Sequence, residues 1–165
     1  MATKRRVATR KPKTEAKVLK FTAPPSEAVE GKALVKLAQT DIMFSAIQII
    51  EAGGDNNLHS HAGMDGMWFV LEGRARFYGT LDDVVLAELD PHQGIYIPRE
   101  FPYWFEQIGD ERLVLLQVEA IDRTVKNIRT DYKEQKGSAA SVQMFEIDGT
   151  PINRGIFSPG LDEDG

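Results

Sequence analysis

From residue 34 onward, short apolar runs alternate with clusters of turn-forming residues. The runs are rich in β-branched and aromatic side chains, which is typical of strands rather than helices. Turn signals at residues 79–83, 90–93 and 109–111 separate several of them. This spacing predicts an all-β sandwich or barrel. The predicted strands are Met43–Glu51, Asn57–His61, Met67–Glu72, Arg74–Tyr78, Val84–Glu88, Gly94–Ile97, Tyr103–Gln107 and Leu113–Ala120.

The same pattern divides the chain into three parts. Residues 1–33 are expected to form a basic flexible arm and an extended lead-in, because Pro24 and Pro25 exclude a helix there. Residues 34–121 form the barrel, and a short peripheral helix is expected around residues 123–134. Residues 122–165 form a C-terminal tail that could pack on the barrel, cross to a partner subunit or remain loose. The apolar side chains that favour packing are Phe145, Ile147, Ile156 and Phe157.

Composition narrows the class of protein. At 165 residues the chain is long enough for one well-buried domain and short for two. It contains no cysteine, so any metal site must use nitrogen and oxygen ligands. No apolar run approaches the roughly 20 residues that a membrane helix requires, and the N-terminus lacks the apolar stretch of a secretory signal. We therefore expect a soluble, cytoplasmic protein without a membrane partner.

The net charge of −5 is unevenly distributed. Residues 1–20 contain eight lysines and arginines against Glu15 alone, a net charge of +7, so the rest of the chain carries −12. Such an arm could contact nucleic acid or an anionic surface. Because neither interleaved aromatic residues nor a helical period accompanies the charges, we interpret it as a solvated arm and expect no nucleic-acid partner.

The most informative motif is His59-Ser60-His61. Strand side chains alternate between two faces, so these histidines point to the same side and can converge on one target. Neutral imidazole is the commonest protein ligand for a transition metal. A turn cluster at residues 53–57 precedes the motif, and an apolar, strand-like run ends at Gly73 after it.

This arrangement resembles the first signature of the cupin superfamily. Gly53, His59, His61 and Gly73 are in register with that signature, but Gly66 stands where the family has glutamate. Asp65 is one residue away. A shift of one residue along a strand moves a side chain to the opposite face, so Asp65 substitutes only if a bulge or loop redirects it.

A second, less complete signature follows. Pro98 fits the family pattern, whereas His92 and Glu100 stand in the places of two glycines. Tyr103 stands at the place of the family's ligand histidine, and Gln107 at the place of its asparagine.

The resemblance covers roughly residues 34–120 and implies a double-stranded β-helix, the cupin or jelly-roll barrel. It also implies a cavity lined by inward-facing side chains, and alternation then puts Trp68 and Val70 on one inward face and Tyr103, Phe105 and Gln107 on another.

The resemblance implies a divalent transition metal, Fe, Mn, Ni or Zn, held by His59 and His61. Two histidines are too few for a strong site, so oxygen ligands are needed, and they must come from Asp65, Tyr103, Gln107 or water. Tyr103 and His61 are the candidate catalytic residues, because a phenol can ligate a metal or act as a general acid. The candidate substrate-binding residues are Trp68, Tyr96, Phe105 and Gln107.

Three functions remain open. The first is a small-molecule enzyme in which the metal polarises a carbonyl or carboxylate or activates dioxygen. The second is a metal-free isomerase or lyase in which a histidine abstracts a proton and Tyr103 returns one. The third is a ligand-binding or regulatory cupin without catalysis. As similar proteins commonly do, the chain is expected to form a homodimer. Its expected ligand is a small-molecule substrate.

Overall fold

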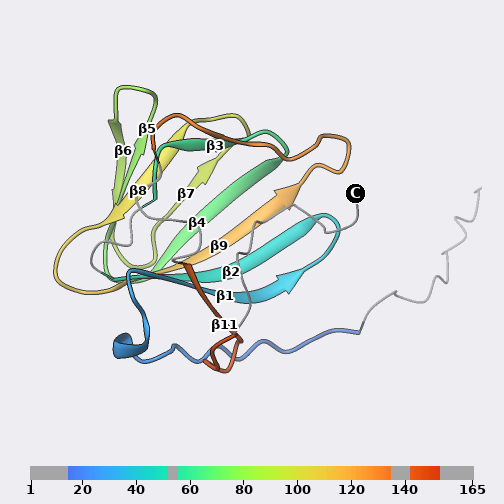
Figure 1. Cartoon of the computed structure of the whole chain (residues 1–165), viewed down its shortest axis with the longest axis vertical. Helices are drawn as coiled ribbons and strands as arrows, with labels where there is room; N and C mark the ends of the chain where they lie inside the picture. The colour runs from blue at the N-terminus through green and yellow to red at the C-terminus, as the bar shows by residue number, and fades with distance from the viewer. Residues whose placement is uncertain (1–14, 52–55, 135–141, 153–165) are drawn as a thin grey trace, which may run out of the picture.

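The computed structural model describes residues 15–51, 56–134 and 142–152; the predictions on Gly53, Ile156 and Phe157 lie outside these ranges. The described strands form two sheets packed against each other (Figure 1). In spatial order, the six-stranded sheet contains β11 (Val142–Phe145), β1 (Lys32–Gln39), β2 (Met43–Ile50), β9 (Leu113–Ile121), β4 (Met64–Glu72) and β7 (Gly94–Ile97). The five-stranded sheet contains β10 (Arg129–Asp131), β3 (His59–His61), β8 (Tyr103–Gln107), β5 (Ala75–Gly79) and β6 (Val84–Leu89).

This architecture confirms the predicted all-β, double-stranded β-helix class. All eight predicted strands are present, and β7 and β8 have the predicted bounds. The strand β1 was not predicted, because its sequence lacks clear alternation. The helix expected around residues 123–134 was wrong: turns lead into β10, which pairs antiparallel with β3 from Arg129 opposite His61 to Asp131 opposite His59. Pairing to an open strand edge outweighed the weak local preference for helix.

The main core lies between the two sheets and follows from the alternation of apolar residues. In β4 and β9, alternate side chains point inward, and these pack against aromatic residues of β5 and β8. Trp68 and Val70 are both buried, as predicted. The buried residues of this core are Ile50, Trp68, Val70, Ala75, Phe77, Leu89, Ile97, Tyr103, Phe105, Leu113 and Leu115.

The lead-in and the tail cover the outer face of the six-stranded sheet, where the N-terminal segment runs beside β11 (Figure 1). Val29 and Phe145 are buried there against Val35 and Ile49. The Thr22 backbone N–H donates to the carbonyl oxygen of Ile147 at 3.0 Å. The described part of the tail, residues 142–152, therefore packs on its own barrel. In the described ranges, no helix is long and apolar enough to cross a membrane.

Candidate functional site

His59 lies in β3, directly opposite Tyr103 of β8, and is 2% exposed. Its Nδ1 lies 2.7 Å from the carbonyl oxygen of Asn57. A carbonyl oxygen only accepts hydrogen bonds, so Nδ1 carries the proton and the lone pair is on Nε2. The Asn57 carbonyl therefore fixes both the tautomer and the orientation of this ring.

His61 lies beside His59, with the ring centroids 5.0 Å apart and the planes nearly perpendicular. Burial, with a smaller contribution from the Arg129 guanidinium, lowers the pKa of His61 to about 4. The same two causes hold the pKa of His59 well below its ordinary value. Both rings are therefore neutral at pH 7. The Nδ1 atom of His61 is buried and has no hydrogen-bond partner among the described residues.

The ring of Tyr103 lies close to the rings of His59 and Trp68. Its ring centroid lies 4.6 Å from that of His59 and 4.9 Å from that of Trp68. Burial raises the pKa of Tyr103 well above its ordinary value, and the negative charge of Glu119 raises it further. The phenol therefore stays protonated at neutral pH and is a hydrogen-bond donor. As a metal ligand the phenol would have to ionise, which burial and the charge of Glu119 oppose, so Tyr103 as a ligand stays a prediction.

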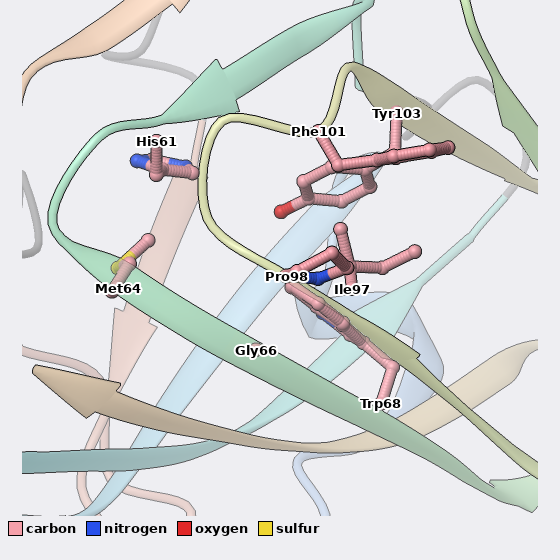
Figure 2. Close-up of a pocket in the computed structure, with 8 residues that line it drawn as sticks. All are labelled: His61, Met64, Gly66, Trp68, Ile97, Pro98, Phe101 and Tyr103. Carbon is pink, nitrogen blue, oxygen red and sulfur yellow. The ribbon is translucent and has the colours of Figure 1, made fainter.

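A small pocket opens beside these groups, with Trp68 and Tyr103 reaching into it from opposite sides and His61 at its edge (Figure 2). The indole Nε1–H of Trp68 is buried without a hydrogen-bond partner in the described structure. The cavity volume is about 10 Å³, enough for about one water molecule. The pocket is lined by His61, Met64, Gly66, Trp68, Ile97, Pro98, Phe101 and Tyr103.

Asp65 does not face this pocket. It lies between the inward-facing Met64 and Gly66, so its side chain projects from the other face of β4. There its Oδ2 accepts a hydrogen bond from Arg99 Nη2 at 3.0 Å, and its Oδ1 accepts one from the Arg99 backbone N–H at 2.9 Å. No bulge redirects it among the described residues, so the structure does not bring Asp65 together with His59 and His61.

Three predicted substrate-binding residues also lie elsewhere. Tyr96 is 62% exposed, because it follows the inward–outward alternation of β7 and pairs with the outward-facing Met67. Gln107 donates from Nε2 to the carbonyl oxygens of Gly109 and Glu111, so it holds a turn at the end of β8. Phe105 is 1% exposed and stacks on Phe77 in the core. Of the four predicted residues, only Trp68 lines the pocket.

The sequence analysis missed Glu119, a carboxylate inside the barrel. It lies in β9 directly opposite Gly66 and is 1% exposed. Burial raises the pKa of Glu119 to about 7, although Gln117 donates a hydrogen bond to its Oε1. Alternation along β9 was an available signal, because Leu113, Leu115 and Glu119 occupy positions of the same parity.

A polar cluster made of Arg129 and Asp131 on β10 and of Asn57, just before β3, flanks the two histidines. Arg129 donates from Nε to Asp131 Oδ1 at 2.9 Å and from Nη2 to Asn57 Oδ1 at 2.6 Å. Asn57 in turn donates from Nδ2 to Asp131 Oδ1 at 2.8 Å. Because Arg129 lies directly opposite His61, its positive charge contributes to keeping the imidazoles neutral.

These donors do not fit a tightly held divalent metal. Across residues 15–51, 56–134 and 142–152, no group of three or more His, Asp or Glu side chains is placed to hold one. The hydrogen bond from His59 to a backbone carbonyl is typical of a ligating histidine. However, residue 66 has no side chain, Asp65 faces away and Tyr103 retains its proton. Structural and catalytic sites generally need three or more protein ligands.

The family is decided by comparison with known proteins. A family model described as Cupin matches residues 22–143. The chain belongs to the cupin family. No curated protein sequence matches this cupin.

Solved structures agree with the fold. An uncharacterized conserved protein with a double-stranded beta-helix domain from Klebsiella pneumoniae is 13% identical, with a TM-score of 0.60 over 77% of this chain and 100% of that one. The protein TT1209 from Thermus thermophilus is 20% identical, with a TM-score of 0.50 over 62% and 91%. The cupin domain of Schizosaccharomyces pombe Cnp3 is 15% identical, with a TM-score of 0.50 over 55% and 65%. At these identities the likeness concerns the fold alone.

Proposed function

We propose that this cupin is a metal-independent isomerase or lyase that moves protons on a small hydroxycarbonyl compound. Because the pocket as it stands holds about one water molecule, the compound enters when the side chains that line the pocket move apart. The observation that carries the proposal is the set of polar groups around one pocket. The buried Nδ1 of His61 and Nε1–H of Trp68 have no hydrogen-bond partner among the described residues, and the protonated Tyr103 faces them. Buried polar groups are nearly always hydrogen-bonded, so unpartnered ones beside a pocket favour a polar ligand.

These groups have complementary roles in proton transfer. A neutral imidazole at His61 can accept the proton on the carbon next to a carbonyl group. The Tyr103 hydroxyl can donate to the carbonyl oxygen as negative charge develops there. Returning one proton to the neighbouring carbon completes an isomerisation, and loss of a protonated leaving group completes an elimination. Neither reaction has a net gain or loss of electrons, so no redox partner is required.

The test is proton exchange in D₂O, followed by NMR, on glycolaldehyde, glyceraldehyde and dihydroxyacetone. We expect exchange and isomerisation above the buffer rate that EDTA does not affect. Tyr103→Phe and His61→Gln should each lower the rate by about 10²-fold or more. The matched control is Tyr96→Phe, which removes a hydroxyl from an exposed tyrosine outside the pocket and should not change the rate.

Other outcomes distinguish the alternatives. Loss of turnover with EDTA and its recovery with Fe, Mn, Ni or Zn would replace this proposal with the metal-dependent enzyme. Saturable binding of these compounds without exchange would instead favour the ligand-binding, non-catalytic cupin.

A further inference from the structure

Three buried polar side chains form a hydrogen-bonded chain inside the barrel. Gln48 of β2 donates from Nε2 to Gln117 Oε1, and Gln117 of β9 donates from Nε2 to Glu119 Oε1. Gln48 and Gln117 are each 5% exposed, and Glu119 is 1% exposed. Water is therefore largely excluded from all three.

The carboxylate gives this chain a single direction. Above its pKa of about 7, Glu119 is ionised and only accepts hydrogen bonds, so Gln117 then turns its amide NH₂ toward it. The carbonyl oxygen of Gln117 then accepts from the NH₂ of Gln48, which leaves the Gln48 carbonyl oxygen at the far end. Gln48 Oε1 and Glu119 Oε2 are both buried and without a hydrogen-bond partner in the described part of the chain. The chain thus ends in an unused acceptor on each side.

The acceptor chain does not line the pocket itself, but its Glu119 end lies next to residues that do. Glu119 lies directly opposite Gly66, and Gln117 directly opposite Trp68, both of which line the pocket. Paired residues in an antiparallel sheet project from the same face, so these side chains share the barrel interior. Tyr103 is close enough to Glu119 for the carboxylate to affect its ionisation.

We propose that Gln48 and Glu119 form an acceptor subsite that binds the hydroxyl or ammonium groups of the ligand. The subsite rests on the proposed function, since it specifies which small molecules the pocket selects. A ligand with donor groups can satisfy an unpaired acceptor oxygen, whereas an anion would be repelled by the carboxylate of Glu119. The raised pKa of Glu119, caused mainly by burial, is consistent with a carboxyl group that lacks a positive partner.

Binding can be measured separately from turnover with the two tryptophans as reporters. The indole N–H of Trp68 lies in the barrel interior, whereas that of Trp104 donates to Asp83 Oδ1 at 2.8 Å outside it. Full-length ¹⁵N-labelled protein is titrated with ethylene glycol and methylammonium, which carry donors, and with acetonitrile and acetate, which do not. We expect a saturable shift of the Trp68 signal with the first two probes only, and no shift of the Trp104 signal.

Variants then test whether the shift of the Trp68 signal depends on the acceptor chain of Gln48, Gln117 and Glu119. Glu119→Gln, which preserves side-chain volume, should weaken binding of methylammonium and ethylene glycol at least tenfold. Gln48→Leu should weaken it at least threefold and serves as the second variant if Glu119→Gln does not fold. The matched control is Glu88→Gln, at an exposed glutamate paired with Arg76 on β5, which should bind both probes like the wild type.

Three results would overturn the subsite. They are preferential binding of acetate, unchanged binding in both acceptor variants, or no shift with any probe. Donor binding without proton exchange would instead refute the proposed function and leave the subsite intact. Proton exchange that Glu119→Gln does not affect, together with unchanged probe binding, would refute only the subsite.

Discussion

The ring of Trp68 occupies the space that a side chain on Gly66 would need. A Cβ atom on Gly66 would lie 2.3 Å from Cη2 of Trp68 and 2.4 Å from Cζ3. Both residues point inward from β4, two positions apart on the same strand face. A glutamate at position 66, where the family signature has one, would therefore displace this ring. The departure from the signature at Gly66 and the aromatic residue at Trp68 are sterically linked.

This contact predicts a non-additive effect on stability. Gly66→Ala should lower the free energy of unfolding by about 1–3 kcal/mol, because the added methyl group overlaps the indole. In a Trp68→Leu background the same substitution should lower it much less, since the indole is gone. Urea denaturation of the four proteins gives the double-mutant cycle. Equal losses in both backgrounds would show that the overlap relaxes by another route.

Glu119 should make the protein less stable as pH rises. Its pKa is about 7 in the folded state against an ordinary 4.5, so between these values the folded state binds more protons than the unfolded state. Stability then falls with increasing pH across this window, by about 3 kcal/mol in total. In Glu119→Gln this slope should be absent, whereas Glu88→Gln should retain it. The measurement is urea denaturation at pH 4.5 to 7.5.

His61 should have the opposite effect in an overlapping pH range. Its pKa is about 4 in the folded state against an ordinary 6.5, so the unfolded state binds more protons between these values. Stability then falls as pH decreases from 6.5 to 4, by up to about 3 kcal/mol. The free energy of unfolding of His61→Gln, taken relative to that of the wild type, should therefore be higher at pH 4.5 than at pH 7.5. The control is His92→Asn, at an exposed histidine; a similar gain there would argue against a buried neutral imidazole.

Asp65 should contribute to stability and not to the site. Its ion pair with Arg99 joins β4 to the residue that follows Pro98, and both side chains are partly exposed. Asp65→Asn is expected to lower the free energy of unfolding by less than about 1 kcal/mol. Proton exchange on glyceraldehyde should be unchanged in this variant. A loss of exchange rate as large as that of His61→Gln would show that Asp65 takes part in the function.

Metal content is the remaining prediction. Protein purified without added metal or an immobilised-metal column should contain well below one equivalent of Fe, Mn, Ni or Zn by elemental analysis. His59→Ala/His61→Ala should not change that content, because the two imidazoles lack the further ligands of a strong site. Near-stoichiometric metal that disappears in the double variant would establish the metal centre and reverse this conclusion.

Much of the fold could be predicted from local pattern. Alternation and turn residues located β7 and β8 within their observed bounds and put Trp68 and Val70 inside the barrel. β10 could not be found in this way, because its three exposed residues form a strand only by pairing with β3. Likewise, the burial of Phe145 depends on a parallel pairing of β11 with β1 that joins distant parts of the chain.

The sequence by itself determined that His59 and His61 lie on one strand and face the same way, since a period of two is a property of the backbone. It also determined that a glycine, Gly66, stands where the family signature has a glutamate. Only the tertiary structure decided what surrounds the two rings. Arg99 holds Asp65 on the outer face, while β9 brings the carboxylate of Glu119 opposite Gly66. These contacts join residues far apart in the chain, and their positions follow from strand register and packing rather than from local composition.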